Sequence, residues 1–215
     1  MKTNLIILAI SLFTISVSGQ EDSYTSAMNS TLLQMDQATG AEQYLDCANH
    51  FERIASAEKS KWMPYYYASH CLALMSFEES NGEQRDKILD RAQDLLDQSM
   101  ELNSDESVKS ELQVLQAFIY PSRIMVDPMG RGGLYFEKMF ASLETAKAQN
   151  PDNPRCYFLE GSYKLNIPAE MGGGAEAARP ILEQALALFG SFSNPDPLWP
   201  TWGEEATRNE LEKIQ

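Results

Sequence analysis

Histidine and cysteine are scarce in this chain of 215 residues, which contains two histidines and three cysteines. Two histidines, His50 and His70, are too few for a multi-histidine metal site, and we interpret each as a helix-surface or core-edge residue. The cysteines, Cys47, Cys71 and Cys156, are odd in number and form no CxxC pair. The sequence favours three small buried side chains, with a Cys47–Cys71 disulfide as the alternative in an oxidising compartment.

Basic residues are also few, because 17 lysines and arginines stand against 31 aspartates and glutamates, a formal net charge of −14. This balance repels nucleic-acid phosphates and anionic lipid surfaces, so the sequence predicts no nucleic-acid partner. The sequence contains no GxSxG, HExxH or Walker motif. It therefore predicts a protein that is not an enzyme, with no catalytic residues, no resident cofactor and no bound metal.

A long apolar run occurs in one place, near the N-terminus, where "LIILAISLFTISV" follows the first four residues. This run is typical of a signal peptide and is short for a membrane span. Val17 and Gly19 supply small residues before a cut at Gln20, so we expect residues 1–19 to be removed, with an uncleaved N-terminal anchor as the alternative. We expect an exported protein, periplasmic or secreted, in which residues 20–215 form one domain outside the membrane.

The rest of the sequence is organised in helices, because apolar residues recur with a helical period and no run alternates as a strand would. In one segment, for example, Leu89, Ala92 and Leu96 share a stripe whose opposite face is polar. The sequence therefore predicts an all-α fold. The predicted helices span about 23–36, 40–57, 61–79, 83–102, 105–120, 134–148, 154–166, 176–189 and 202–214.

Two stretches rich in glycine and proline interrupt this pattern, "PSRIMVDPMGRGG" (121–133) and "NIPAEMGGG" (166–174). Both are predicted to be enlarged turns whose glycines adopt backbone conformations closed to other residues. Within the first, Asp127 is expected to cap a helix and Arg131 to pair with Asp127. A phosphate site at the following helix start is disfavoured, since no strand precedes it and no lysine follows.

The second helices of the predicted pairs share a spacing: a small or compact residue, an apolar one four positions later, and a small one three after that. This spacing resembles the second helix of the tetratricopeptide repeat (TPR), although the repeats lie farther apart than in that family. The longer segments, including "PLWPTWG", also look like small exported TPR-like proteins of Gram-negative bacteria. The residues that carry the spacing are Ala92, Leu96 and Ser99, then Met139, Leu143 and Ala146, then Ala178, Leu182 and Ala185.

The resemblance implies a right-handed TPR-like solenoid of about four helical hairpins plus a C-terminal capping helix. In such a fold the small residues lie at helix crossings, and first helices face a concave groove. Trp199 and Trp202 are expected to pack the last helix over the final repeat. The implied function is a non-enzymatic scaffold whose groove binds a protein or peptide, neutral or basic because the chain is acidic.

The segment "KWMPYYYASHC" (61–71) holds the candidate partner-binding residues Trp62, Tyr65, Tyr66 and Tyr67. Adjacent helical residues are about 100° apart, so three neighbouring tyrosines span most of the circumference. Two of them can be buried between a hairpin partner and the next repeat, which leaves a third for the groove. Two alternatives stay open: all three rings belong to the core, or exposed aromatic residues form a binding module for a small molecule or glycan.

Overall fold

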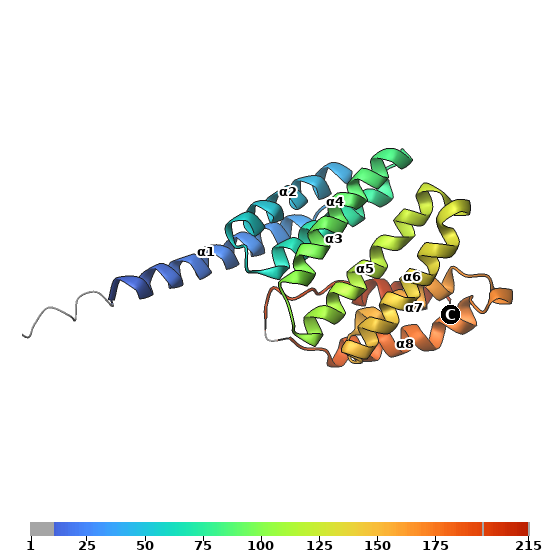
Figure 1. Cartoon of the computed structure of the whole chain (residues 1–215). Helices are drawn as coiled ribbons and strands as arrows, with labels where there is room; N and C mark the ends of the chain where they lie inside the picture. Colours follow the sequence, from blue (N-terminus) through green and yellow to red (C-terminus); the bar gives the residue numbers. More distant parts are fainter. Residues whose placement is uncertain (1–10, 195, 215) are drawn as a thin grey trace, which may run out of the picture.

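The computed structural model of the chain describes residues 11–194 and 196–214 (Figure 1). This part of the chain contains nine α-helices, one 3₁₀ helix and no strand, which confirms the all-α prediction. None of its helices is long and apolar enough to cross a bilayer. The elements are α1 (Ser11–Asp36), α2 (Ala41–Ala57), α3 (Trp62–Glu78), α4 (Gly82–Glu101), α5 (Glu106–Val126), α6 (Pro128–Gln149), α7 (Pro154–Leu165), η1 (Ala169–Met171), α8 (Ala175–Ser191) and α9 (Glu204–Lys213).

More than half of the predicted signal peptide, residues 1–19, is not described by the structure. Its first ten residues lie outside the described residues, and cleavage before Gln20 stays a prediction. From Glu21 onward α1 belongs to the fold, because Tyr24 and Met28 are buried in the core. The domain therefore uses the chain directly after the predicted cut.

Side-chain caps set several helix starts. The side chains of Asn81, Asp105 and Asn153 accept hydrogen bonds from backbone N–H groups in the first turns of α4, α5 and α7. These N–H groups have no partner within the helix, so each cap satisfies a donor that would otherwise be exposed. The predicted starts of these three helices agree with the structure to within one residue.

The loop predicted at 121–133 is wrong, because α5 continues to Val126 and α6 begins at Pro128. Pro121 lies inside α5, where it cannot donate to the carbonyl of Ala117, four residues earlier. The hydroxyl of Tyr163 donates to that carbonyl at 3.1 Å instead. The helix thus tolerates its proline because α7 supplies the missing donor.

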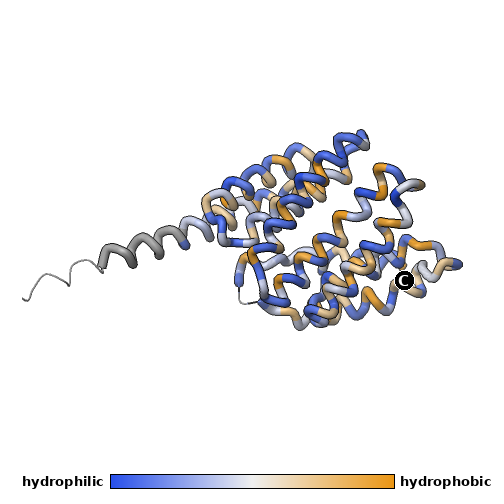
Figure 2. Tube along the Cα trace, viewed as in Figure 1, coloured by the Kyte–Doolittle hydropathy of each residue, from blue (hydrophilic) through white to orange (hydrophobic). Residues whose placement is uncertain are grey.

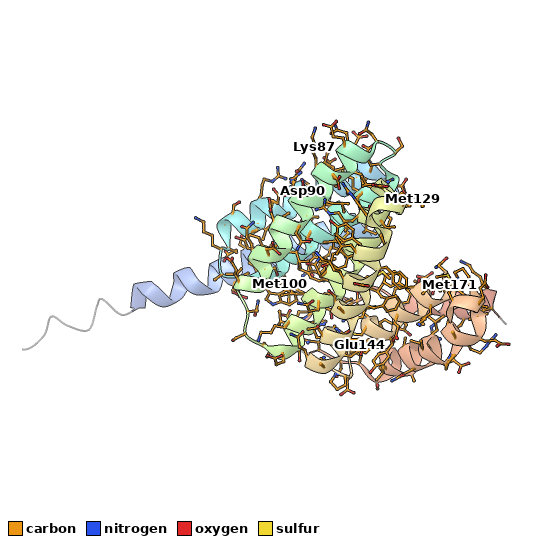
Figure 3. All side chains as sticks on the ribbon, turned by 45° about the vertical axis from the view of Figure 1, so that its right-hand side comes forward. Lys87, Asp90, Met100, Met129, Glu144 and Met171 are labelled. Carbon is orange, nitrogen blue, oxygen red and sulfur yellow. The ribbon has the colours of Figure 1, made fainter. Side chains whose placement is uncertain are left out.

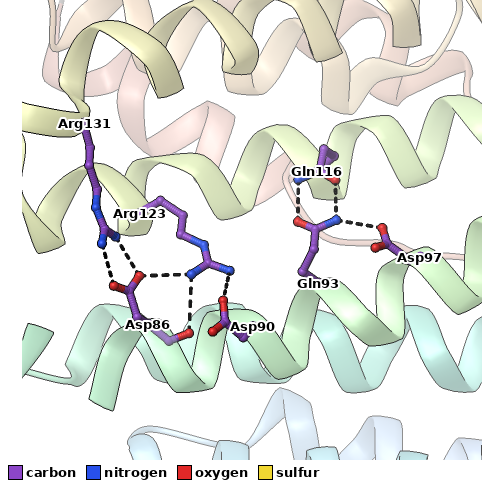
Figure 4. Close-up of polar contacts among 7 residues, drawn as sticks. All are labelled: Asp86, Asp90, Gln93, Asp97, Gln116, Arg123 and Arg131. Carbon is purple, nitrogen blue, oxygen red and sulfur yellow. Dashed lines mark hydrogen bonds and ion pairs between the residues drawn. The ribbon is translucent and has the colours of Figure 1, made fainter. Parts of the chain in front are cut away.

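Asp127 caps α6, as predicted, by accepting a hydrogen bond from the N–H of Gly130. The predicted partner of Arg131 is wrong. Its guanidinium donates two hydrogen bonds of 2.7 Å to the carboxylate of Asp86 on α4 (Figure 4). Arg123 of α5 donates to the same carboxylate at 3.0 Å.

Farther along the contact between α4 and α5, the side-chain amides of Gln93 and Gln116 exchange hydrogen bonds of 2.7 and 2.9 Å (Figure 4). Gln93 also donates to the carboxylate of Asp97 at 2.8 Å. Polar contacts therefore join α4 to α5 and α6, the helices where the predicted loop would have lain.

Successive helices pack on one another, and their apolar faces form two core clusters. One cluster joins α1 to α5, and the other joins α5 to α9. Figure 2 shows hydrophilic and hydrophobic residues alternating along the helices, as expected of amphipathic helices. The small residues Ala92, Ala146, Ala178 and Ala185 have no exposed surface, which confirms that they occupy close helix contacts.

The residues between α8 and α9 take an unexpected path. Residues 196–203, which we call the C-terminal segment, run back to the N-terminal helices (Figure 1). Leu198 and Trp199 are buried in the first core cluster together with α3. Trp202 does pack on Phe158 of α7, with ring centroids 6.2 Å apart, but it also contacts α3. The tryptophans thus join the two halves of the domain rather than only cap its end.

Candidate ligand-binding site

Two of the three adjacent tyrosines on α3 are fixed by the C-terminal segment. Tyr66 has no exposed surface, and its hydroxyl accepts a hydrogen bond of 2.8 Å from the indole N–H of Trp202. Tyr67 is buried, and its hydroxyl donates to the carbonyl of Leu198 at 2.7 Å. Residues more than 130 positions away in the sequence therefore cover both of these rings.

The other two predicted site residues lie nearer the surface. Tyr65 is half-buried and donates its hydroxyl to the carbonyl of Ala55 on α2 at 3.3 Å. Trp62 is half-buried at the start of α3, with its ring 5.3 Å from that of Trp199 in an edge-to-face contact. Trp62 lines a hollow beside Lys61 and α1, whereas Tyr67 lines a different cavity. The structure therefore does not bring the four residues into one site.

The cavity that Tyr67 lines has a volume of about 340 Å³ and lies between α1, α3 and the C-terminal segment. We call it the aromatic cavity. Ligand sites in proteins usually occupy about 300–1,000 Å³, so it is at the small end of that range. Its lining residues are Asn29, Leu32, Leu33, Met35, Asp36, Tyr67, His70, Pro197, Trp199, Thr201 and Trp202.

His70 is the most unusual group in this lining. It is 4% exposed, and its Nδ1 is buried with no hydrogen-bond partner in the described part of the chain. Its ring packs 5.1 Å from that of Trp202 and 5.3 Å from that of Phe118. Burial, reinforced by the positive charge of Arg155, lowers the pKa of His70 to about 3. The imidazole is therefore neutral at physiological pH.

Trp199 adds a second unused polar group to the same cavity. Its indole N–H is buried and has no acceptor among the described residues. Buried polar groups without a partner are rare in folded proteins. Two side chains that line the aromatic cavity therefore each hold a buried polar atom without a partner among the described residues.

A buried ion pair lies beside Trp202, one of the residues that line the cavity. The guanidinium of Arg155 donates to both oxygens of Glu111, at 2.5 and 2.8 Å, and both side chains are almost completely buried. Burial alone would lower the pKa of Arg155, but the Glu111 carboxylate raises it above its ordinary value. The guanidinium lies 5.9 Å from the ring of Trp202 and 5.1 Å from that of Phe192. Trp202 is therefore packed against both Arg155 and His70.

The rim of the cavity is polar and carries little positive charge. Asn29 and Thr201 are exposed there, and Asp36 is the one charged side chain among the described lining residues. In the described part of the chain, no three histidine, cysteine, aspartate or glutamate side chains gather into a metal-ion site. The cavity thus combines aromatic rings and apolar side chains with a polar rim.

The cysteines do not contribute to this lining. Cys47, Cys71 and Cys156 are all buried with free thiols, as the favoured interpretation of the sequence expects. Burial raises the pKa of the Cys156 thiol to about 12, so it stays protonated and unreactive at neutral pH.

Comparison with known proteins relates the whole domain to one solved structure. No protein-family model matches the chain, and no curated protein sequence matches it. The HusA haemophore from Porphyromonas gingivalis superposes with a TM-score of 0.79 and is 30% identical in sequence. The match covers 89% of this chain and 92% of that one. The chain belongs to the HusA family.

The relationship to HusA supports an all-helical binding protein of the exported kind. HusA is described as a haemophore, a protein that carries haem. The relationship does not test the TPR resemblance or the choice between periplasm and secretion, which stay predictions.

Sequence reasoning found part of the aromatic cavity of this HusA-family protein. It selected Tyr67 but placed His70 at a helix surface or core edge and assigned Trp199 and Trp202 to a terminal cap. It gave no role to Leu32, Leu33 or Met35. The available signal was the crowding of tryptophan and proline in "PLWPTWG", because a helix-capping segment alone does not need two indole rings.

Proposed function

We propose that this protein is an exported, non-enzymatic carrier that binds haem or a related tetrapyrrole in the aromatic cavity. The observation that carries the proposal is the lining itself: indole, phenol and imidazole rings face aliphatic side chains across a cavity of ligand size. A flat aromatic macrocycle gains most from such a site, because stacking and apolar burial both contribute to its binding. Membership of the HusA family supports the same ligand class.

The residues present fit such a cargo. His70 contributes a neutral imidazole, whose buried Nδ1 makes no hydrogen bond among the described residues, and Met35 contributes a thioether to the same lining. Histidine and methionine are both side chains that hold haem iron in proteins. The cavity is at the small end of the usual range, so we propose that the ligand stays partly exposed, as suits a carrier that must release it.

The chain's own residues provide binding rather than chemistry. Trp199 and Trp202 provide aromatic rings, and Leu32 and Leu33 add apolar surface from α1. We propose no catalytic step, and haem is cargo rather than a resident cofactor. The small-molecule alternative raised from the sequence thus becomes the leading function.

A protein-binding scaffold, the leading interpretation of the sequence, is the second candidate. Apolar side chains on α5 and α6 are exposed, including Met125, Leu134 and Phe136, as is Met129 near the start of α6. Met129 and Met171 project from the surface (Figure 3), with exposed fractions of 96% and 74%. Exposed apolar side chains can contribute to contacts with other proteins where they gather into a patch. The TPR-like solenoid and a neutral or basic partner remain part of this second proposal.

Titration with haemin and with metal-free protoporphyrin IX tests the first proposal. The three tryptophans of the chain are Trp62, Trp199 and Trp202, and all lie beside or within the C-terminal segment. Both porphyrins should therefore quench most of the intrinsic fluorescence at a stoichiometry of one ligand per protein. Failure of both porphyrins to quench would rule the proposal out.

A matched pair of surface variants locates the site. Leu33 at the cavity is 62% exposed and Leu134 on α6 is 56% exposed, so Leu→Glu is tolerated by the fold at either position. Leu33→Glu should weaken porphyrin binding, because it places charge and bound water at the cavity mouth. Leu134→Glu should leave the affinity unchanged. Equal affinities for the two variants would place the ligand elsewhere, and a loss confined to Leu134→Glu would direct attention to α6.

A further inference from the structure

A second hollow lies directly beside the aromatic cavity. It has a volume of about 460 Å³ and lies between α1, the start of α3 and the C-terminal segment; we call it the Lys61 hollow. Pro197 lines both spaces. The ring of Trp62 in the Lys61 hollow packs edge to face on that of Trp199 in the aromatic cavity, with centroids 5.3 Å apart. The two spaces are therefore neighbours.

The two spaces also follow the same face of α1. Thr25 lines the Lys61 hollow, and Asn29 and Leu33 line the aromatic cavity. Residues four positions apart in a helix lie on one face, one turn after another. The hollow and the cavity thus lie in line along α1, on the side that meets the C-terminal segment.

The Lys61 hollow is more polar than the aromatic cavity. Beside the indole of Trp62 it holds the carboxylates of Glu21 and Asp196. It also holds the ammonium group of Lys61, the one lysine or arginine among the described residues that line either space. Lys61 donates to both oxygens of Glu21 at 3.2 Å, whereas such charged hydrogen bonds usually measure about 2.7–2.9 Å. An ammonium group has three donors, so Lys61 can still donate to a further acceptor.

We infer that a tetrapyrrole held in the aromatic cavity extends past Pro197 into the Lys61 hollow, where Trp62 and Lys61 contact its polar edge. This inference rests on the proposed function. A tetrapyrrole such as haem combines a flat apolar ring with carboxylate side chains, and the apolar cavity and the polar hollow match these two parts. The aromatic cavity alone is at the small end of the usual range for ligand sites, whereas the two spaces together fall well inside it. The other charged residues of both linings are acidic, so Lys61 is the group that attracts the ligand carboxylates.

Lysine footprinting of the wild-type protein tests the inference. Limited acetylation with acetic anhydride, measured by mass spectrometry, is compared with and without metal-free protoporphyrin IX. Lys61 should be acetylated several times more slowly in the complex, because the ligand covers its ammonium group. Lys59 is the control: it is exposed two positions earlier and lines neither space, so its rate should not change. An unchanged rate at Lys61 in the complex would overturn the inference.

Two neighbouring residues on α1 provide a second test. Thr25 lines the Lys61 hollow, whereas Ser26 is exposed and lines neither space. Thr25→Glu places a like charge against the ligand carboxylates and should weaken protoporphyrin binding about fivefold, the effect of one charge at contact distance in water. Ser26→Glu adds the same charge at the next position and should change the affinity by less than about twofold, since salt and solvent screen it. Equal affinities of the two variants would show that the ligand does not reach the hollow.

The outcomes separate this inference from the function on which it rests. If Leu33→Glu weakens porphyrin binding while Thr25→Glu and the acetylation of Lys61 show no effect, the ligand is confined to the aromatic cavity. The inference then fails and tetrapyrrole binding stands. Absence of protoporphyrin binding by the wild-type protein overturns both proposals together. The footprint needs no variant, so it tests the inference even if Thr25→Glu disturbs the fold.

Discussion

Trp202 donates its indole N–H to the hydroxyl of Tyr66 at 2.8 Å, across 136 positions of sequence. This hydrogen bond ties the end of the chain to its third helix. The acceptor, Tyr66, is completely buried. Removing its hydroxyl would leave the indole N–H of Trp202 without a hydrogen-bond partner, which destabilises the folded state.

Tyr66→Phe should therefore lower the free energy of unfolding by about 1–3 kcal/mol, measured by chemical denaturation. Tyr65→Phe is the matched control, since the hydroxyl of Tyr65 makes a longer bond of 3.3 Å to Ala55 at a half-buried position. Its effect should be below about 1 kcal/mol. Equal losses would mean that the Trp202 contact contributes nothing specific.

The Glu111–Arg155 pair should be far more sensitive than surface ion pairs. Glu111→Gln leaves a buried guanidinium without its counter-charge and should cost about 3–5 kcal/mol of stability, measured by thermal or chemical unfolding. Glu106→Gln removes an exposed partner of Lys109 instead and should cost at most about 1 kcal/mol. A Glu111→Gln variant as stable as Glu106→Gln would refute the importance of this pair.

Acid should weaken the ion pairs through which Asp86 joins α4 to α5 and α6. Hydrogen bonds from Arg131, and secondarily from Arg123, hold the pKa of Asp86 below its ordinary value. A lowered folded-state pKa means that the unfolded chain binds the proton more readily, so this stabilisation is present above the ordinary carboxyl pKa and is lost as pH falls below it.

Asp86→Asn should thus be less stable than wild type at pH 7, by about 1 kcal/mol. The difference should shrink as pH is lowered through the acid range below about 4. Unfolding free energies measured from pH 7 to pH 3 test this expectation. Asp94→Asn, an exposed change on the same helix, should track wild type throughout; a gap for Asp86→Asn that stays constant with pH would contradict the assignment.

Charge at the cavity rim should work against an anionic porphyrin. Asp36→Asn removes the one charged side chain among the described lining residues and should raise porphyrin affinity by about twofold to fivefold, since exposed charges interact weakly in water. Asp46→Asn makes the same charge change at an exposed position on α2 outside the lining and should have no effect. Added salt should raise wild-type affinity in the same direction. A fall in affinity for Asp36→Asn would show that this carboxylate instead contacts the ligand.

Local pattern was enough to predict most helices and their close contacts. The buried positions of Ala92, Ala146 and Ala185 follow from spacing within single helices. The run through Pro121 was unpredictable from local pattern, because its tolerance depends on the hydroxyl of Tyr163, in another helix. Likewise, Arg131 found its partner on α4 rather than in its own turn.

The candidate site was harder to predict, because three separate parts of the chain contribute to it. Tyr67 was selected from its neighbours in sequence, but its role depends on Leu198, which approaches from the C-terminal segment. His70 looked ordinary because its lack of hydrogen-bond partners is a property of the folded surroundings. A helical period records which face of a helix is covered, but it does not record which distant segment covers it.

The return of the C-terminal segment to α3 also sets when the cavity can exist. Ribosomes build the chain from its N-terminus, so α1 and α3 are complete well before residues 196–203 are made. Until then the cavity lacks the wall that holds Trp199 and Trp202. An unfinished or prematurely truncated chain therefore lacks the residues that complete the lining of the aromatic cavity.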